Sequence, residues 1–185
     1  MIKKITMIWV YKGIIQKSDE DVYEYGLDLM LYTILNIVVI LCSATIIKKL
    51  SESVALLSVI IPLQSIGGGY HAETHLRCFM IMYIGWWGSI LILPLIPVEV
   101  ALIMICVAIL VVCRFAPISH KNVKMSALQR EKMRKYARML AIIYGASSTM
   151  FIFFVSVRIG IALSTGLGII SLSMLLAQCK ALLAK

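Results

Sequence analysis

Charged residues are scarce in this sequence. Only 15% of its 185 residues are Asp, Glu, Lys or Arg, whereas 61% are hydrophobic. Soluble domains carry about 25% charged residues, so this composition excludes an ordinary soluble fold and indicates a chain whose main solvent is lipid. The length leaves room for one unit, and we expect residues 1–185 to form a single membrane-embedded domain.

The chain also lacks the paired cysteine spacing of metal knuckles and disulfide frameworks. Its five cysteines are odd in number and scattered. Four of them, Cys42, Cys106, Cys113 and Cys179, lie in apolar runs, where a free thiol behaves as a small buried hydrophobe. The fifth, Cys78, lies among histidines and is therefore the candidate for chemistry.

No repeat of fixed period and no low-complexity linker is present, and apolar runs follow one another along the chain. A spanning helix needs roughly 20 apolar residues. Candidate spans fall at 27–47, 54–66, 79–95, 98–112, 139–157 and 159–179. The second is short and ends in Gly67-Gly68-Gly69, residues that a helix interior disfavours. We predict an all-α polytopic membrane protein of about six transmembrane helices, with a glycine-rich break before the third. A re-entrant second segment is the alternative.

Acidic residues are half as numerous as basic ones, 9 against 18, and the positions of the basic residues predict an orientation. Short cytoplasmic loops are enriched in Lys and Arg. With six spans and a cytoplasmic N-terminus, all the basic residues except Lys48, Lys49 and Arg158 face the cytoplasm. We therefore predict a multi-pass protein whose two termini, whose segment around His71 and whose loop at 114–138 are cytoplasmic.

That loop is the one sizeable polar insertion. Ser126 and Gln129 stand at capping-box spacing before good helix formers, which predicts a basic helix leading into the fifth span. Such a helix could rest against anionic lipid head groups or bind an acidic peptide, and the residues leave both interpretations open.

Ionisable side chains crowd together between the second and third runs. His71, Glu73, His75, Arg77 and Cys78 follow one another within a few positions at a predicted membrane boundary. Polar groups near the hydrocarbon layer are costly, so such a cluster indicates function. A nearby imidazole, a cation or a helix N-terminus favours a thiolate. Cys78 is therefore the predicted nucleophile.

The residues alone do not decide which histidine is its base. On an unbroken helix His71 lies about 10.5 Å along the axis from Cys78, whereas His75 is a surface neighbour. His71 can reach the thiol only if the chain folds back, which glycine at φ > 0 allows. A zinc site of His71, His75 and Cys78 is a further alternative. Ala72, however, stands where zinc peptidases have their glutamate.

This stretch resembles the AgrB family (accessory gene regulator B), membrane peptidases that process quorum-sensing propeptides in Gram-positive bacteria. The shared pattern is a glycine pair, one residue, His-Ala, and a cysteine seven residues after the histidine. Here it reads Gly68-Gly69-Tyr70-His71-Ala72, followed by Cys78. The resemblance extends to the length, the series of apolar runs and an aromatic-Ala-Pro step, Phe115-Ala116-Pro117. Family members usually continue that step with an acidic residue and a later proline, which this chain lacks.

The resemblance implies a membrane cysteine endopeptidase of the bacterial cell membrane, with His71 as general base and Cys78 as nucleophile. It implies cleavage of an AgrD-type propeptide through a thioester acyl-enzyme, followed by cyclisation to an autoinducing peptide. The basic loop would then hold the acidic C-terminal tail that such propeptides carry. No cofactor and no metal are implied. The expected partners are the propeptide and the lipid bilayer, not nucleic acid, and a homodimer is left open.

Two other function classes are alternatives. One is a zinc-dependent membrane enzyme. The other is a non-enzymatic transporter or pore subunit, for which Asn36, Gln64 and Gln178 supply few intramembrane polar groups.

Overall fold

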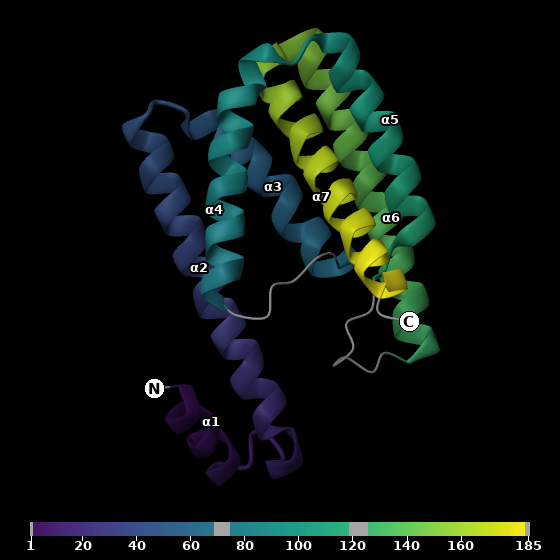
Figure 1. Ribbon diagram of the computed structural model, residues 1–185. Helices are drawn as coiled ribbons and strands as arrows, with labels where there is room; N and C mark the ends of the chain where they lie inside the picture. Colours follow the sequence, from purple (N-terminus) through teal and green to yellow (C-terminus); the bar gives the residue numbers. More distant parts are fainter. Residues whose placement is uncertain (1, 69–74, 119–125, 184–185) are drawn as a thin grey trace.

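The fold is a bundle of helices. The computed structural model of the chain describes residues 2–68, 75–118 and 126–183, and every regular element in these ranges is helical (Figure 1). The seven α-helices are α1 (Ile2–Tyr11), α2 (Glu20–Ile46), α3 (Leu50–Gly67), α4 (His75–Ile92), α5 (Val98–Phe115), α6 (Ala127–Met150) and α7 (Val157–Leu183). Two 3₁₀-helices, Lys17–Asp19 and Leu93–Leu95, and a π-helix, Phe151–Val155, adjoin them. The all-α prediction is confirmed.

Six of these helical segments are long and apolar enough to cross a bilayer, as predicted. The second, α3, begins at Leu50 rather than at residue 54 and has 18 residues, which is enough for a full span. It ends at Gly67. The predicted glycine-rich break before the third span falls largely on residues 69–74, which lie outside the described residues, and it stays a prediction.

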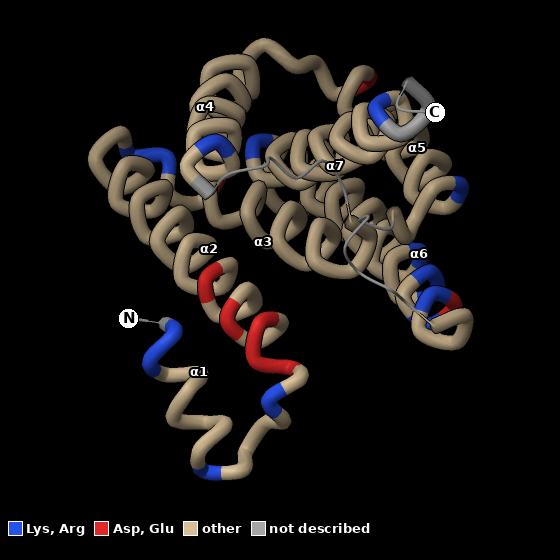
Figure 2. The backbone as a smooth tube through the Cα atoms, turned by 60° about the horizontal axis from the view of Figure 1, so that its bottom comes forward, with Lys and Arg blue, Asp and Glu red and all other residues tan. Residues whose placement is uncertain are grey.

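α2 and α6 extend beyond the rest of the bundle at the same end (Figure 1). α2 has 27 residues, and α6 with the π-helix has 29. At 1.5 Å per residue each exceeds the hydrocarbon thickness of about 30 Å by roughly 10 Å. Acidic residues begin α2 and basic residues begin α6 (Figure 2). Asp28, a charge that the predicted first span contained, lies near the edge of the α2 overhang.

α7 is the central helix. Most of its membrane-spanning part is buried, whereas α2, α4, α5 and α6 bury much less of theirs. Its glycines allow this because each meets a different neighbour. A Cβ on Gly166 would lie 3.0 Å from Val59 of α3, and one on Gly168 would lie 2.7 Å from Met104 of α5. Helices in lipid associate through such close approaches of small residues.

α4 is held to one side of this bundle by polar contacts. The Trp86 indole Nε1 donates a hydrogen bond to Ser53 Oγ of α3 at 2.9 Å, and both side chains are buried. The hydroxyls of Tyr83 and Ser43, on α2, lie 3.1 Å apart and share a hydrogen bond. α4 therefore stands beside α2 (Figure 1).

α1 was not among the helices predicted from the sequence. It lies outside the bundle and packs on the start of α2 (Figure 1). There the rings of Trp9 and Tyr23 meet edge to face, with their centroids 6.4 Å apart. Apolar residues at positions 2, 5 and 9 follow helical spacing, and this was the signal available in the sequence.

Candidate active site

Cys78 is the fourth residue of α4 and lies in its first turn. α4 thus begins four residues before the predicted third span, 79–95, so that Cys78 belongs to the helix. Its side chain is half-buried, whereas Cys42, Cys106 and Cys179 are exposed on the outside of the bundle. Cys113, at the end of α5, is also half-buried.

The predicted base cannot be placed in the same way. His71 and Glu73 lie within 69–74, outside the described residues. His75 is the first residue of α4, but its side chain is likewise outside the description. The choice between His71 and His75 therefore stays a prediction. The alternative zinc set includes the same two histidines and stays untested with them.

Cys78 lines a cleft of about 210 Å³ between α2, α3, α4 and α7. Two polar side chains, Gln64 of α3 and Ser173 of α7, belong to its lining. The other lining residues are Ile40, Leu56, Leu57, Ile60, Ile81, Met82, Gly85, Trp86, Ile169, Ile170, Leu172 and Leu176. The thiol thus opens into an apolar space that four helices build together.

The end of α3 is fixed against the segment that follows α5. The backbone N–H of Ile118 donates a hydrogen bond to the carbonyl of Gly67 at 2.9 Å. Gly68 has a φ of 71°, in the left-handed region that favours glycine, and a Cβ there would lie 2.6 Å from the Ile118 carbonyl oxygen. The family-like glycines and the Phe115-Ala116-Pro117 step are therefore neighbours in space. The chain segments that carry His71 and the first half of the basic loop both leave from this junction.

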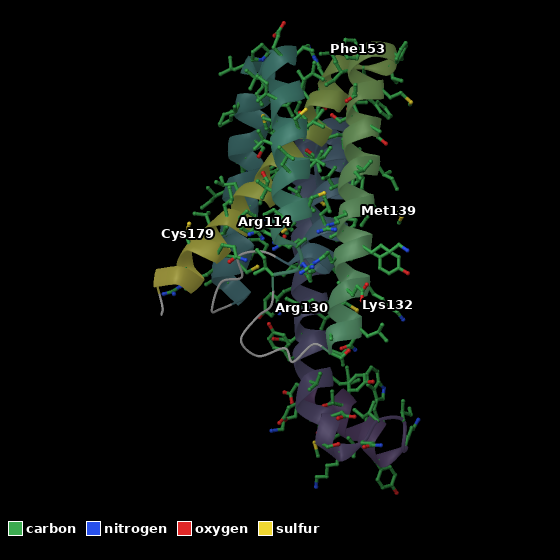
Figure 3. All side chains as sticks on the ribbon, turned by 90° about the vertical axis from the view of Figure 1, so that its right-hand side faces the viewer. Arg114, Arg130, Lys132, Met139, Phe153 and Cys179 are labelled. Carbon is green, nitrogen blue, oxygen red and sulfur yellow. The ribbon has the colours of Figure 1, made fainter. Side chains whose placement is uncertain are left out.

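The predicted basic helix is confirmed as the overhang of α6. Ser126 and Gln129 form the predicted capping box, with hydrogen bonds of 3.2 and 3.0 Å. Figure 3 shows Arg130 and Lys132 at this end of α6 and Phe153 at the other. Arg138 joins α6 to the end of α5, because its guanidinium donates two hydrogen bonds, of 3.2 and 2.8 Å, to the Cys113 carbonyl.

The remaining exposed basic residues of the α6 overhang form a cationic surface at the end of the bundle that carries Cys78 (Figure 2). They are Arg130, Lys132, Arg134 and Lys135. A single acidic residue, Glu131, stands among them. The excess of positive charge on this surface favours anionic groups, either of lipids or of a peptide.

The family model AgrB, described as Accessory gene regulator B, matches residues 2–180. No curated protein and no solved structure matches the chain.

Gly68→Val should lower the thermal stability of the protein in detergent, because the side chain meets both a positive φ and the Ile118 carbonyl. Gly13→Val is the matched control. Gly13 has a φ of 67°, but a Cβ there would have no atom within 4 Å. The unfolding midpoint, followed by size-exclusion chromatography after heating, should fall further for Gly68→Val. Equal effects of the two changes would show that the contact with Ile118 is unimportant.

Proposed function

The chain belongs to the accessory gene regulator B family, and from this we propose that it is a membrane cysteine endopeptidase with Cys78 as nucleophile and His71 as general base. Family membership and the six candidate spans make it a multi-pass membrane protein of quorum-sensing propeptide processing.

The observation that carries the proposal is the position of Cys78. The cysteine of the family-like motif is half-buried in the first turn of α4 and opens into an apolar cleft. A helix N-terminus favours a thiolate because unpaired backbone N–H groups gather there. The other four cysteines begin no helix. Among the cysteines, this position is the one suited to a nucleophile.

The proposed reaction has two stages. In the first, Cys78 Sγ attacks a peptide carbonyl of the propeptide, and a C–S bond replaces the C–N bond. As general base, His71 first takes the proton of the Cys78 thiol, and the departing nitrogen, which keeps the electron pair of the C–N bond, then takes that proton from His71. The N-terminal part of the propeptide stays attached as a thioester.

In the second stage, a cysteine or serine within the substrate gives its proton to His71 and attacks the thioester carbonyl. The new C–S or C–O bond closes the ring, and cleavage of the bond to Cys78 Sγ returns Cys78 as a thiolate. Hydrolysis competes with this step. A cleft that excludes water and holds the internal nucleophile close to the carbonyl favours ring closure through high effective molarity. The mainly apolar lining around Cys78 favours such exclusion of water.

We place the Cys78 end of the bundle in the cytoplasm. Of the described basic residues, all but Lys48, Lys49 and Arg158 lie at this end or on the overhangs beyond it (Figure 2). At the opposite end Lys49 is partly neutralised by a salt bridge to Glu52 at 3.2 Å. This asymmetry follows the positive-inside rule. The cationic surface of α6 then faces the cytoplasm, where it can bind the acidic tail of a propeptide.

The nucleophile can be tested by substitution. When the chain is co-expressed with an AgrD-type propeptide, Cys78→Ala should abolish cleavage because no other group supplies the thiolate. A variant with alanine at Cys42, Cys106, Cys113 and Cys179 together should still cleave. Immunoblotting of a C-terminally tagged propeptide measures both results, and cleavage by Cys78→Ala would exclude the proposed mechanism.

The assignment of the base predicts unequal effects at the two histidines. His71→Ala should slow cleavage by about 10²–10⁴-fold, the value of a positioned general base, and His75→Ala should slow it much less. Cleavage rates in isolated membranes at matched protein levels provide the comparison. Severe loss in His75→Ala with little change in His71→Ala would transfer the role of base to His75.

The orientation predicts which surface cysteines can be labelled from outside. In a variant without native cysteines, a membrane-impermeant maleimide should label Leu95→Cys in intact cells, because this residue is 78% exposed at the outer end. Lys132→Cys, on the α6 overhang, should react only after permeabilisation. Labelling of Lys132→Cys in intact cells would reverse the topology.

A further inference from the structure

The cleft beside Cys78 extends along one face of α4. Cys78, Ile81, Met82, Gly85 and Trp86 line it at spacings of three, four, seven and eight residues, which is a single helical face. Eight residues correspond to about 12 Å along the helix axis. The cleft therefore runs from the thiol at the bundle end toward the bilayer interior.

The deep end of the cleft is rigid. Trp86 is only 2% exposed, and its hydrogen bond to Ser53 fixes the indole against α3. On the opposite wall, α7 contributes Ile169, Ile170 and Leu172. Because this hydrogen bond fixes Trp86 at the deep end of the cleft, the indole limits how far a bound group can extend toward the bilayer interior.

The size of the cleft suits one large apolar side chain. An apolar cavity of about 150 Å³ is large enough to bind benzene, and this cleft has about 210 Å³. Its lining contains no charged residue among those described. An aromatic or long aliphatic side chain fits, whereas an acidic one would lose its hydration without a partner.

The space depends in part on Gly85. A Cβ at this position would have no atom within 4 Å, so the glycine faces open volume rather than a packed neighbour. A longer side chain on Gly85 would occupy the cleft itself. Gly88, one turn further along α4, also has no atom within 4 Å of an added Cβ but does not line the cleft.

We propose that this cleft is a specificity subsite, which binds a large apolar side chain on the residue whose carbonyl carbon Cys78 attacks. The inference rests on the proposed peptidase function and adds a requirement on its substrate. The side chain of that residue is attached to the Cα atom next to the reacting carbonyl carbon, so it must lie close to Sγ. An apolar cleft that begins at the thiol is the adjacent space.

Two arguments assign the cleft to the acyl side of the scissile bond rather than to the leaving side. The acyl residue stays attached to Cys78 in the thioester, and its side chain in the cleft would keep water from that intermediate. The leaving segment begins the acidic tail, which is better matched by the cationic α6 surface. Gly85, Met82 and Trp86 would then set the size of the accepted side chain.

The first test measures the cleft without any substrate. In a variant with alanine at the other four cysteines, Cys78 is alkylated in membranes with N-benzylmaleimide or N-methylmaleimide. Gly85→Leu should lower the benzyl-to-methyl rate ratio at least about tenfold, whereas Gly88→Leu should leave it unchanged. The two reagents partition differently into lipid, but this difference affects both variants equally, so the Gly88→Leu control accounts for it. Equal ratios in both variants would show that the cleft does not admit a side chain beside the thiol.

The second test uses the co-expressed AgrD-type propeptide with Phe, Leu or Ala at the attacked residue. The unaltered chain should cleave the Phe or Leu forms about 10- to 100-fold faster than the Ala form. Gly85→Leu should remove most of this preference while it still cleaves the Ala form, and Gly88→Leu should preserve it.

The outcomes separate the two proposals. Loss of all three substrates to the same extent in Gly85→Leu, or an unchanged preference, would overturn the subsite and leave the cleft to a lipid chain. Cleavage by Cys78→Ala would instead overturn the peptidase mechanism, and the alkylation ratio would still report on the cleft.

Discussion

The arrangement of the bundle depends on how closely other helices can approach α7. In hydrocarbon the backbone must satisfy its own hydrogen bonds, which makes helices obligatory, but lipid provides no hydrophobic force to bring helices together. Association must come from close packing and polar contacts. Gly160, Gly166 and Gly168 supply the close packing, because each lets α7 approach a different neighbouring helix. Ser148 adds a buried hydrogen bond to the Gly160 carbonyl at 2.7 Å.

The cleft exists where this close packing stops. α4 joins the bundle through Tyr83 and Trp86, whose polar atoms reach α2 and α3, and no glycine of α7 brings it into contact with the centre. Space therefore remains between α4 and α7, and Gly85 leaves it open on the α4 side. Cys78 occupies the end of this space nearest the charged overhangs. Because α4 does not pack closely against α7, an apolar cleft remains beside the candidate nucleophile.

Near the candidate site, two parts of the sequence that are separated by α4 and α5 come into contact. The hydrogen bond between Ile118 and Gly67 joins the end of α3 to the end of α5. At the same end of α5, Arg138 of α6 donates its hydrogen bonds to the Cys113 carbonyl. The glycine motif and the basic helix consequently share one support. A substrate held by its charged tail on α6 would be close to the segment that leads to Cys78.

Local features of the sequence were sufficient for the number of spans, the all-helical class and the α6 cap. Hydrophobic length is a sum over neighbouring residues, and the Ser126–Gln129 capping box is complete within four positions, so both can be recognised without the fold. The ionisable residues around Cys78 distinguished it from the other cysteines, and the structure places it in the first turn of α4, but its role as nucleophile stays a prediction. The helix α1 was not predicted, because its apolar periodicity is short and charged residues surround it.

Only the tertiary structure decided that α7 is central, that Gly67 meets Ile118 and that Cys78 opens into a cleft. All three depend on which helix faces meet across long separations in the chain. Hydropathy is nearly the same for a lipid-facing and a helix-facing apolar residue, because both environments are dry. The sequence could therefore indicate that Gly85 and Gly166 lie in membrane helices, but not that one borders open space while the other touches Val59.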